Sequence, residues 1–368
     1  MRYGKYFGLA VPLGIGAVSL AFAATTPSLV SAQTPSLPSV TASQLLGDVL
    51  GAVPQPVTGT VQEISQILPS GVSLGGSSLS SLSQFLSGTN SFNVWRASSS
   101  EYRVQYQGGQ SEQDLYVSGK SAWLWDSATQ KATQLNLPSS PGTTGALGAD
   151  PQMVADQFIQ NLAPYGRVSL GANTFVGGIA SYDLKIQSLQ SGSTVSQVNI
   201  YVDSQYNQVL GVDAVASGSS SPSFSLEYSK VAFTAPSSSV FQFTPPSGAT
   251  VKSLTPMNSG SAFMPSGHNA PSGVSGSTKT AMATLGAGFE KVFVSQPGAF
   301  AKLTSSGSAK SYSQLLTEAE QQVTVLGQTD QYLSTPFLDA LVLPDGKILA
   351  GTVKLSVLEA DATLLGNA

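Results

Sequence analysis

Side chains able to carry out acid–base or nucleophilic chemistry are few in this sequence. The 368 residues include one histidine and no cysteine. This excludes a cysteine nucleophile, a thiolate metal site, a histidine-rich metal site and a disulfide framework. The histidine, His268, lies among Ser, Gly, Asn and Pro, a neighbourhood typical of a solvated loop rather than of a rigid general base.

The carboxylates form no catalytic pattern along the chain. The closest sets are Glu112 with Asp114 and Glu318 with Glu320, and both are expected on loop or helix surfaces. Acids paired from distant strands stay open, because glycosidase-type sites assemble in space rather than in sequence. The sequence contains no G-x-S-x-G elbow, phosphate loop, H-E-x-x-H or calcium loop. We therefore expect no enzymatic activity, no cofactor and no metal.

The charge pattern excludes further classes of partner. Only 10% of the residues are charged, the formal net charge is −4, and Lys and Arg form no cluster. Such a balance argues against nucleic acid and against an anionic lipid surface as partners.

The N-terminus has the layout of a secretory signal peptide. Arg2 and Lys5 precede an uncharged stretch over 7–24 that is dominated by small apolar residues. Cleavage is expected after Ala23 or after Ala32, and the later site is preferred. An uncleaved anchor is the alternative, because the stretch is near the lower limit for a membrane span. Either way the protein is expected outside the cytoplasm, in the cell envelope or secreted.

The rest of the chain is expected to form two domains. The first spans 41–251, and residues 252–286 form a linker rich in Ser, Gly and Pro that cannot bury enough apolar surface to order itself. A small α+β domain follows at 287–368. Ser/Gly-rich stretches at 70–81 and 139–148 are interpreted as loops within the first domain.

Apolar and polar residues alternate along several segments of the first domain. Tyr102, Val104 and Tyr106 are separated by charged or polar residues, and the same pattern recurs at 92–96, 198–203 and 224–229. This period predicts strands with one buried face. The short polar turns between the strands predict antiparallel neighbours.

Helices are expected at four places. Thr41 can cap a helix over 42–53, and Asp150 followed by Pro151 opens a second one. In the C-terminal part we predict a strand at 289–294, a helix at 312–326, a hairpin of 337–343 with 347–353, and a final amphipathic helix at 354–365.

An unusual group of tryptophans lies on the expected strands. Trp123 and Trp125 share one face of their strand, while Ala122 and Leu124 share the other. Neither face is polar, so the sheet must be covered on one side and hold something apolar on the other. With Trp95, the chain has three indoles, more than one thin core requires; for any one of them, ordinary core packing is the simpler interpretation.

Two stretches resemble the lipoprotein carrier (LolA) fold group, which includes the N-terminal domain of the MucB/RseB regulators. They are LYVSGKSAWLWDSATQKATQLNL at 115–137 and VFQFTPPSGATV at 240–251. The first is similar to the family's strand pair and the second to its closing strand. Secreted LolA-like proteins of Gram-positive bacteria are the nearest group, since their C-terminal segment resembles 335–361.

This resemblance implies a fold and a site. The fold would be α+β, a curved antiparallel half-barrel covered by helices, with the small C-terminal α+β domain attached. Its apolar concave face would bind acyl chains, and an arginine on an early strand would bond to the lid; Arg96 is near that place, although a surface ion pair is the alternative. The residues expected in the cavity are Trp95, Tyr102, Val104, Tyr106, Leu115, Val117, Trp123, Trp125, Leu184, Val198 and Ile200. Those expected in the lid are Leu46, Leu50, Phe158, Leu162 and Arg96.

The sequence and the resemblance favour two functions. The first is an exported, non-enzymatic carrier-like protein whose partner is an acyl lipid or lipoprotein. The alternative is an envelope stress regulator of MucB/RseB type, which binds a membrane-bound anti-sigma factor and responds to lipid. A hydrolase is a third interpretation that would require catalytic activity in the purified protein.

Overall fold

The computed structural model describes residues 34–67, 87–108, 111–137, 150–254, 283–301, 320–325 and 327–366. The expected signal peptide, the loops at 70–81 and 139–148, most of the linker, and His268 lie outside the described residues. The described residues belong to one compact unit. They form two β-sheets, three α-helices and short 3-10 turns.

The larger sheet has 13 strands and is not closed. Its strands follow in chain order: β1 (Val57–Gln66), β2 (Ser87–Ser98), β3 (Glu101–Gly108), β4 (Ser111–Ser118), β5 (Ser121–Asp126), β6 (Lys131–Asn136), β7 (Gly166–Leu170), β8 (Thr174–Val176), β9 (Ile179–Ser188), β10 (Val195–Asp203), β11 (Val209–Ala216), β12 (Pro222–Ala232) and β13 (Thr250–Leu254).

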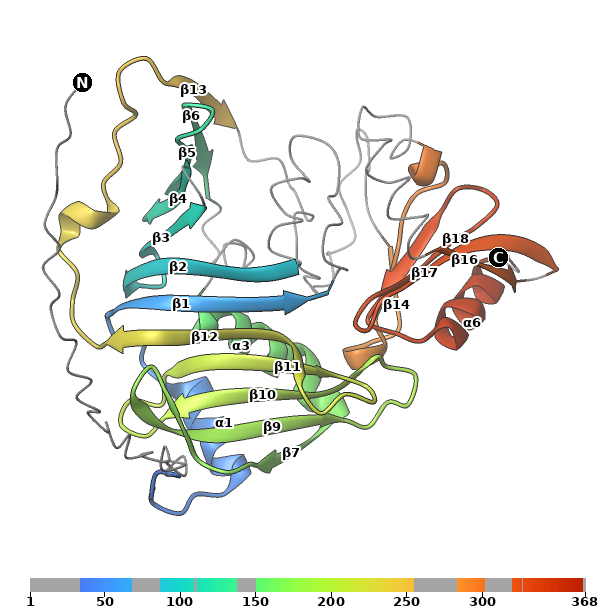
Figure 1. The fold of residues 1–368 in the computed structure, drawn as a ribbon, viewed down its shortest axis with the longest axis horizontal. Coiled ribbons are helices and arrows are strands. Elements are labelled where there is room, and N and C mark those ends of the chain that lie inside the picture. The colour runs from blue at the N-terminus through green and yellow to red at the C-terminus, as the bar shows by residue number, and fades with distance from the viewer. Residues whose placement is uncertain are drawn as a thin grey trace, which may run out of the picture. The chain divides into compact units, whose positions relative to one another are not determined.

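The strands of this sheet lie in the order β13-β6-β5-β4-β3-β2-β1-β12-β11-β10-β9-β7 (Figure 1). β8 pairs only with β9. All pairs are antiparallel except β13, which lies parallel to β6. The expectation of antiparallel neighbours is thus wrong for β13, because a long crossover brings this strand back to the far edge of the sheet. The closing strand expected over 240–251 is shorter and begins later, since the strand in the sheet is Thr250–Leu254.

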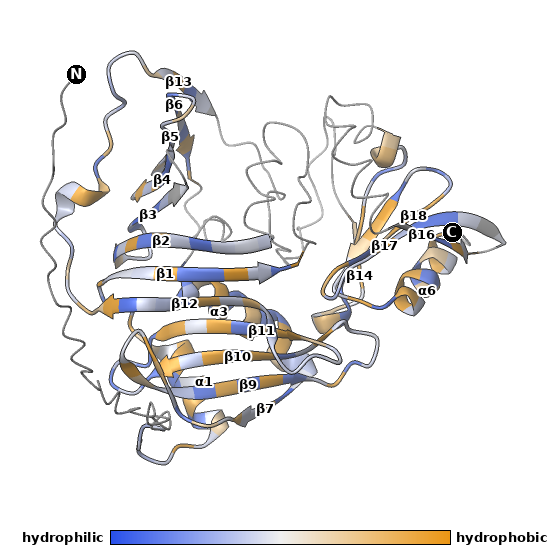
Figure 2. Cartoon of the chain, in the orientation of Figure 1, coloured by the Kyte–Doolittle hydropathy of each residue, from blue (hydrophilic) through white to orange (hydrophobic). Residues whose placement is uncertain are grey.

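The two faces of the larger sheet differ in what they carry. Paired residues of neighbouring antiparallel strands share a face. Val94, Val104 and Leu115 therefore lie on one face, which we call the core face. Trp95, Arg103 and Tyr116 lie on the opposite face, the outer face. The same alternation is visible as mixed hydrophobic and hydrophilic colouring along β9 and β10 in Figure 2.

Two helices pack on the core face of the strands β7 to β12. α1 (Ala42–Gly51) contacts β7 and β9, and α3 (Pro151–Leu162) contacts β11 and β12. Both begin where the sequence predicts. The Thr41 hydroxyl accepts from the Gln44 backbone and the Gln44 side chain accepts from the Thr41 backbone, a capping box. Asp150 caps α3 by accepting from Gln152, and Pro151 occupies the first helical position.

The smaller sheet has six strands in the order β14-β15-β19-β18-β17-β16. They are β14 (Ala283–Leu285), β15 (Val292–Val294), β16 (Glu320–Val325), β17 (Gln328–Ser334), β18 (Asp339–Val342) and β19 (Ile348–Gly351), followed by helix α6 (Leu355–Gly366). The hairpin and the final helix are found where we predict them. The predicted helix over 312–326 is wrong at its C-terminal end, because Glu320–Val325 pairs with β17 as a strand. The strand expected at 289–294 begins only at Val292, since Gly288–Glu290 is a 3-10 turn.

The two sheets meet through the chain between β9 and β10. Gln190 donates from Nε2 to the Ala287 carbonyl and accepts from the Phe289 backbone, at 3.1 and 2.8 Å. The Gly192 backbone donates to Glu290 Oε1 at 2.6 Å. Phe289 itself is fully buried and belongs to the core of the larger sheet. The domain boundaries drawn from the sequence stay predictions.

Candidate functional site

A hollow lies on the core face of the strands β2 to β6. It has a volume of about 300 Å³, at the lower end of the range for small-molecule sites. Its apolar lining comes from one ladder of residues on the core face. The lining residues are Phe92, Val104, Tyr106, Gln113, Asp114, Leu115, Leu124, Trp125, Asp126, Lys131 and Thr133.

Polar residues form one end of this hollow. Gln113 pairs with Asp126 across β4 and β5, and Asp126 pairs with Lys131 across β5 and β6. Asp126 is held in the β5–β6 turn by the backbone amides of Ala128 and Thr129. The hollow therefore joins an apolar floor to a rim with an amide, a carboxylate and an ammonium group.

The core face is filled where helices cover it. Leu184, Val198 and Ile200 are buried in the main hydrophobic core. Val154 and Ile159 of α3, and Leu45 and Val49 of α1, belong to the same core. These side chains pack together as one hydrophobic layer. Leu184, Val198 and Ile200 lie on the expected face, but they act as core.

The residues expected in one cavity divide between the two faces of the sheet. Tyr102, Val104, Tyr106, Leu115 and Val117 lie on the core face, and three of them line the hollow. The three tryptophans do not lie on that face. Trp95 is paired with Arg103, and Trp123 with Tyr116, in a row on the outer face. Trp125 follows two residues later along the same face and touches the hollow only at its edge.

The tryptophans on the outer face contact a returning segment. After β12 the chain passes through a 3-10 turn, Ser238–Phe241, and places Phe243 against β4 and β5. The Phe243 ring stacks on Tyr116 at 4.8 Å and lies 5.5 Å from Trp123 and 5.8 Å from Trp125, between ring centroids. This aromatic cluster explains why β4 and β5 have apolar side chains on both faces: a strap made of chain 233–249 covers their outer face at Phe243.

The positively charged side chain of Arg103 contacts two rings on the same outer face. The Arg103 guanidinium is 5.0 Å from the ring of Trp95 and 4.6 Å from that of Tyr116. It also bonds to Asp114 at 2.8 Å and to Glu112 at 3.4 Å. Burial and the hydrogen bond to Glu112 raise the pKa of Asp114 to about 7, against the lowering effect of Arg103. The expectation that Glu112 and Asp114 lie on a loop or helix surface is therefore wrong, since both lie on β4. Their contacts with Arg103 serve to hold the fold together.

Arg96 forms a buried ion pair beneath α3. Its Nη1 lies 2.8 Å from Oδ2 of Asp150, and the two side chains are only 4% and 2% exposed. A surface ion pair is thus excluded for this arginine. Asp150 Oδ1 accepts from the Gln152 backbone and so caps α3. Gln208 Oε1 lies 3.4 Å from Arg96 Nη2, and Gln152 Oε1 accepts from the Val209 backbone at 2.8 Å. The pair therefore ties β2 to the start of α3 and to the turn before β11.

The other residues expected in the lid differ in their exposure. Phe158 and Leu162 on α3 and Leu46 on α1 are half-buried and pack against the main core. Leu50 is exposed, because it lies on the side of α1 away from the buried Leu45 and Val49.

A polar group on the core face was not anticipated from the sequence. Glu63 on β1 accepts from Asn90 Nδ2 at 2.8 Å, and Ser65 Oγ is buried without a partner among the described residues. Burial raises the pKa of Glu63 to about 7 although the Asn90 bond lowers it. The alternation along β1 predicts that Val61, Glu63 and Ser65 share one face of the strand. The pairing of β1 with its neighbours is needed to show that this face is the buried one.

Neither a metal centre nor a membrane helix emerges from the described residues. They contain no group of three or more His, Cys, Asp or Glu side chains arranged for a metal. None of the described helices has the length and hydropathy that a membrane crossing requires.

Comparisons with known proteins return structures rather than sequences. No protein-family model matches the chain, and no curated protein matches it. A structure of MucB in complex with MucA(peri) is 14% identical and covers 86% of this chain and 96% of its own, with a TM-score of 0.44. The MucA/MucB complex of Pseudomonas aeruginosa is 12% identical and covers 87% and 96%, with a TM-score of 0.43. A LolA superfamily protein from Nitrosomonas europaea is 11% identical and covers 56% and 99%, with a TM-score of 0.24.

The solved structures found include MucB and a LolA superfamily protein, members of the group that the sequence resembles. The larger sheet of this chain has 13 strands and is open. With TM-scores below 0.5, functional conclusions rest on the residues of this chain.

Proposed function

We propose that this chain is an exported, non-enzymatic protein that binds an acyl lipid or the acyl part of a lipoprotein. The observation that carries the proposal is the hollow of about 300 Å³ on the core face, with Phe92, Val104, Leu115 and Leu124 in its lining. Apolar side chains of the core face leave space there.

The energetics of burial support an acyl ligand. Apolar surface gains about 25 cal/mol per Å² when it is removed from water. An acyl segment that buries about 200 Å² in the hollow would therefore gain roughly 5 kcal/mol without any catalytic group. The polar rim of Gln113, Asp126 and Lys131 offers donors and an acceptor for the head of the lipid.

The buried ion pair holds α3 against the packed half of the sheet. The Arg96 side chain is held by Asp150 at the N-terminus of that helix. Movement of α3 away from the sheet would have to break the pair, and leaving a buried arginine unpaired costs about 3–5 kcal/mol. In the proposal, this pair keeps the helix closed over the packed half of the sheet while the ligand occupies the open half.

The remaining parts of the proposal come from the sequence. Residues 1–32 act as the export signal, 41–251 form the lipid-binding domain, and 287–368 form the C-terminal domain. The place of action is outside the cytoplasm, in the cell envelope or in the medium.

Acyl binding can be tested with a fluorescent fatty acid. Val104→Asp and Leu124→Asp each place a carboxylate in the hollow, where an unpaired charge costs several kcal/mol. Both variants should lose uptake by at least about tenfold. The matched control is Ile64→Asp, which adds the same charge to an exposed position on the outer face of β1.

The outcomes separate clearly. Loss of uptake in both core-face variants with the control unchanged supports the hollow as the site. Unchanged uptake in Val104→Asp and Leu124→Asp would refute it. Circular dichroism identifies a variant that has lost its fold, and Leu124→Met then serves as the milder substitution, with a smaller change in affinity expected.

A second candidate is an envelope regulator that holds a membrane-bound anti-sigma factor. The observation in its favour is the smaller sheet, whose outermost described strands, β14 and β16, can each accept an added strand from a peptide. Crosslinking of the full chain in its own cells tests this candidate. Recovery of a single-pass membrane protein that lipid displaces would favour the regulator, and recovery of lipid alone would favour the carrier.

A further inference from the structure

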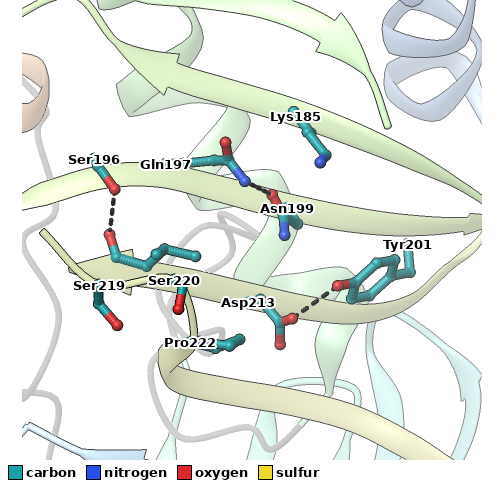
Figure 3. Close-up of a pocket in the computed structure, with 10 residues that line it drawn as sticks. Lys185, Ser196, Gln197, Asn199, Tyr201, Asp213, Ser219, Ser220 and Pro222 are labelled. Carbon is teal, nitrogen blue, oxygen red and sulfur yellow. Dashed lines mark hydrogen bonds between the residues drawn. The ribbon is translucent and has the colours of Figure 1, made fainter. Parts of the chain in front are cut away.

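A second, polar cavity lies on the outer face of the sheet, behind the packed core. It has a volume of about 400 Å³ and lies over β9, β10 and β11 (Figure 3). The same strands bury Leu184, Ile200 and Val212 on their core face. The cavity is therefore separated from the acyl hollow by the thickness of the sheet and belongs to other strands.

The register brings the polar groups of this cavity together. Lys185, Asn199 and Asp213 are directly paired across three neighbouring strands. Tyr201 follows Asn199 by two residues and donates from its hydroxyl to Asp213 Oδ2 at 2.8 Å, the dashed line in Figure 3. Gln197 donates to Asn199 Oδ1 at 2.6 Å. These bonds fix the side chains in place before any ligand arrives.

One buried acceptor in the cavity has no partner. Asp213 is only 5% exposed, and its Oδ1 has no hydrogen-bond partner among the described residues. A buried acceptor left unpaired costs about 1–3 kcal/mol. The residue lines the cavity, so a ligand hydroxyl that reaches this oxygen after a small rotation of the side chain would recover this cost.

The competing group for that oxygen is Glu227 on β12. Burial and the charge of Asp213 raise the pKa of Glu227 to about 7. Glu227 therefore adds negative charge beside the cavity only as the pH rises through about 7. Asp183, which bonds to Lys185 at 3.4 Å, also keeps an unpartnered buried oxygen. This negative surrounding opposes an anionic ligand.

A glycine next to the cavity lets Tyr201 and Glu227 pack closely over β11. Gly211 lies between Tyr201 and Glu227 in the register. A Cβ at this position would lie 2.7 Å from Glu227 Cγ and 3.1 Å from Tyr201 Cδ2. The turn between β11 and β12 supplies a wall with Ser219 and Ser220, which are exposed on a turn made possible by Gly218 at φ +85°.

The lining chemistry selects the ligand class. Among the lining residues, Lys185 and Asp213 carry opposite charges, and the others are mainly amides and hydroxyls. The two lining charges balance each other, and Asp183 and Glu227 beside them disfavour an anionic ligand. Hydroxyl groups both donate and accept, and can therefore satisfy Asp213 Oδ1, the Asn199 amide and the Lys185 ammonium side by side. An apolar ligand would leave Asp213 Oδ1 unpaired and add no hydrogen bond to Asn199 or Lys185.

We propose that this outer-face cavity binds an uncharged, hydroxyl-rich ligand, a saccharide, through Lys185, Asn199 and Asp213. The cavity volume falls within the range of known small-molecule sites. The site acts independently of acyl binding, because it uses the opposite face of the sheet and different strands.

The test uses the full chain and named probes. Glucose, N-acetylglucosamine and trehalose are titrated at millimolar concentrations, followed by saturation-transfer NMR, with glucuronate and spermidine as charged probes. We expect at least one uncharged saccharide to bind more tightly than both charged probes. Asp213→Asn and Asn199→Ala should each weaken that binding about fivefold, the effect of one lost hydrogen bond.

Two further variants keep the test decisive. Ser220→Trp fills the cavity from its exposed wall without touching the carboxylates, and it should abolish saccharide binding even if Asp213→Asn disturbs folding. Asp48→Asn, on the exposed side of α1, should change nothing. Uptake of the fluorescent fatty acid should stay normal in Ser220→Trp, which keeps this proposal distinct from the acyl site.

Three results would overturn the proposal. They are no binding of any of the three saccharides, unchanged binding in Ser220→Trp, and preferential binding of spermidine, which would mark the site as one for cations.

Discussion

Arg96 on β2 and Asp150 at the start of α3 form an ion pair whose atoms Nη1 and Oδ2 lie 2.8 Å apart, and almost no water reaches either side chain. The two residues are 54 positions apart in the sequence. Asp150 uses its other oxygen to cap the helix. One carboxylate therefore both starts α3 and fastens it to the sheet.

Removing this carboxylate should destabilise the protein strongly. Asp150→Ala leaves the Arg96 charge buried without a partner, and we expect a loss of about 3–5 kcal/mol in the free energy of unfolding. Asp150→Asn keeps a cap acceptor and should cost less. Urea denaturation followed by circular dichroism measures both.

The double variant separates the charge from the cap. Arg96→Met with Asp150→Asn removes the unpaired charge and should recover part of the stability lost in Asp150→Asn alone. A loss of only about 1 kcal/mol in Asp150→Ala, the usual value for a helix cap, would show that the ion pair contributes nothing.

Stability should fall as the pH rises toward neutrality. The folded-state pKa of Glu63 is about 7, above its ordinary value of 4.5, because the side chain is buried. The protonated form is the one favoured by folding, so its contribution is fully present below about pH 4.5 and is lost as the pH rises through 7. The difference corresponds to on the order of 3 kcal/mol. Glu227 acts with the same sign.

Glu63→Gln tests this dependence. The variant keeps an acceptor for Asn90 and removes the titrating group, so its unfolding free energy should change less between pH 4.5 and pH 7.5. The control is Glu101→Gln at the start of β3, which should follow the unchanged protein. Equal pH profiles for Glu63→Gln and the unchanged protein would contradict the prediction.

Local signals along the chain predict local structure well. Thr41 and Asp150 mark the two helix starts because their short oxygen-bearing side chains bond to the first free amides. The alternation at 101–106 and 198–203 predicts β3 and β10 because it has the period of a strand. The helix predicted over 312–326 is wrong at 320–325, because pairing with β17, a tertiary contact, decides the conformation of that segment.

The faces of the sheet could not be predicted from the sequence. Trp123 and Leu124 were correctly separated, but which of them joins Val104 depends on the register between β3, β4 and β5. A shift of one residue moves every side chain to the opposite face. The contact of Phe243 with Trp123 depends on the path of the long segment that follows β12. The alignment of Lys185, Asn199 and Asp213 depends on the registers of β9 with β10 and of β10 with β11.

The outer-face tryptophans should affect stability but not acyl binding. Phe243→Ala removes the ring that contacts Tyr116, Trp123 and Trp125, and truncation of a packed phenylalanine typically costs about 3 kcal/mol. Tryptophan fluorescence should shift toward the red as the strap loosens. Fatty-acid uptake should stay within about twofold; a tenfold loss would place the ligand on the outer face instead.

Phe289 should couple the unfolding of the two sheets. Its ring is fully buried in the core of the larger sheet, although it precedes β15 of the smaller one. Phe289→Ala should cost about 3–5 kcal/mol and split a single unfolding transition into two, observable by calorimetry. Phe175→Ala is the control, since Phe175 is exposed on β8. A single transition in Phe289→Ala would show that other contacts couple the sheets.

Acyl affinity should rise with chain length and then level off. Each methylene buried in the hollow adds about 0.8 kcal/mol, so fatty acids of increasing length should bind about fourfold more tightly per carbon while space remains. The limit comes from the volume of about 300 Å³, beyond which further carbons stay in water and add nothing. Leu124→Ala enlarges the hollow and should move the plateau to longer chains, whereas Ile64→Ala on the outer face should leave it in place. Titration calorimetry over the series measures the plateau, and an affinity that keeps rising at an unchanged slope would mean that the chain lies along an open surface rather than inside the hollow.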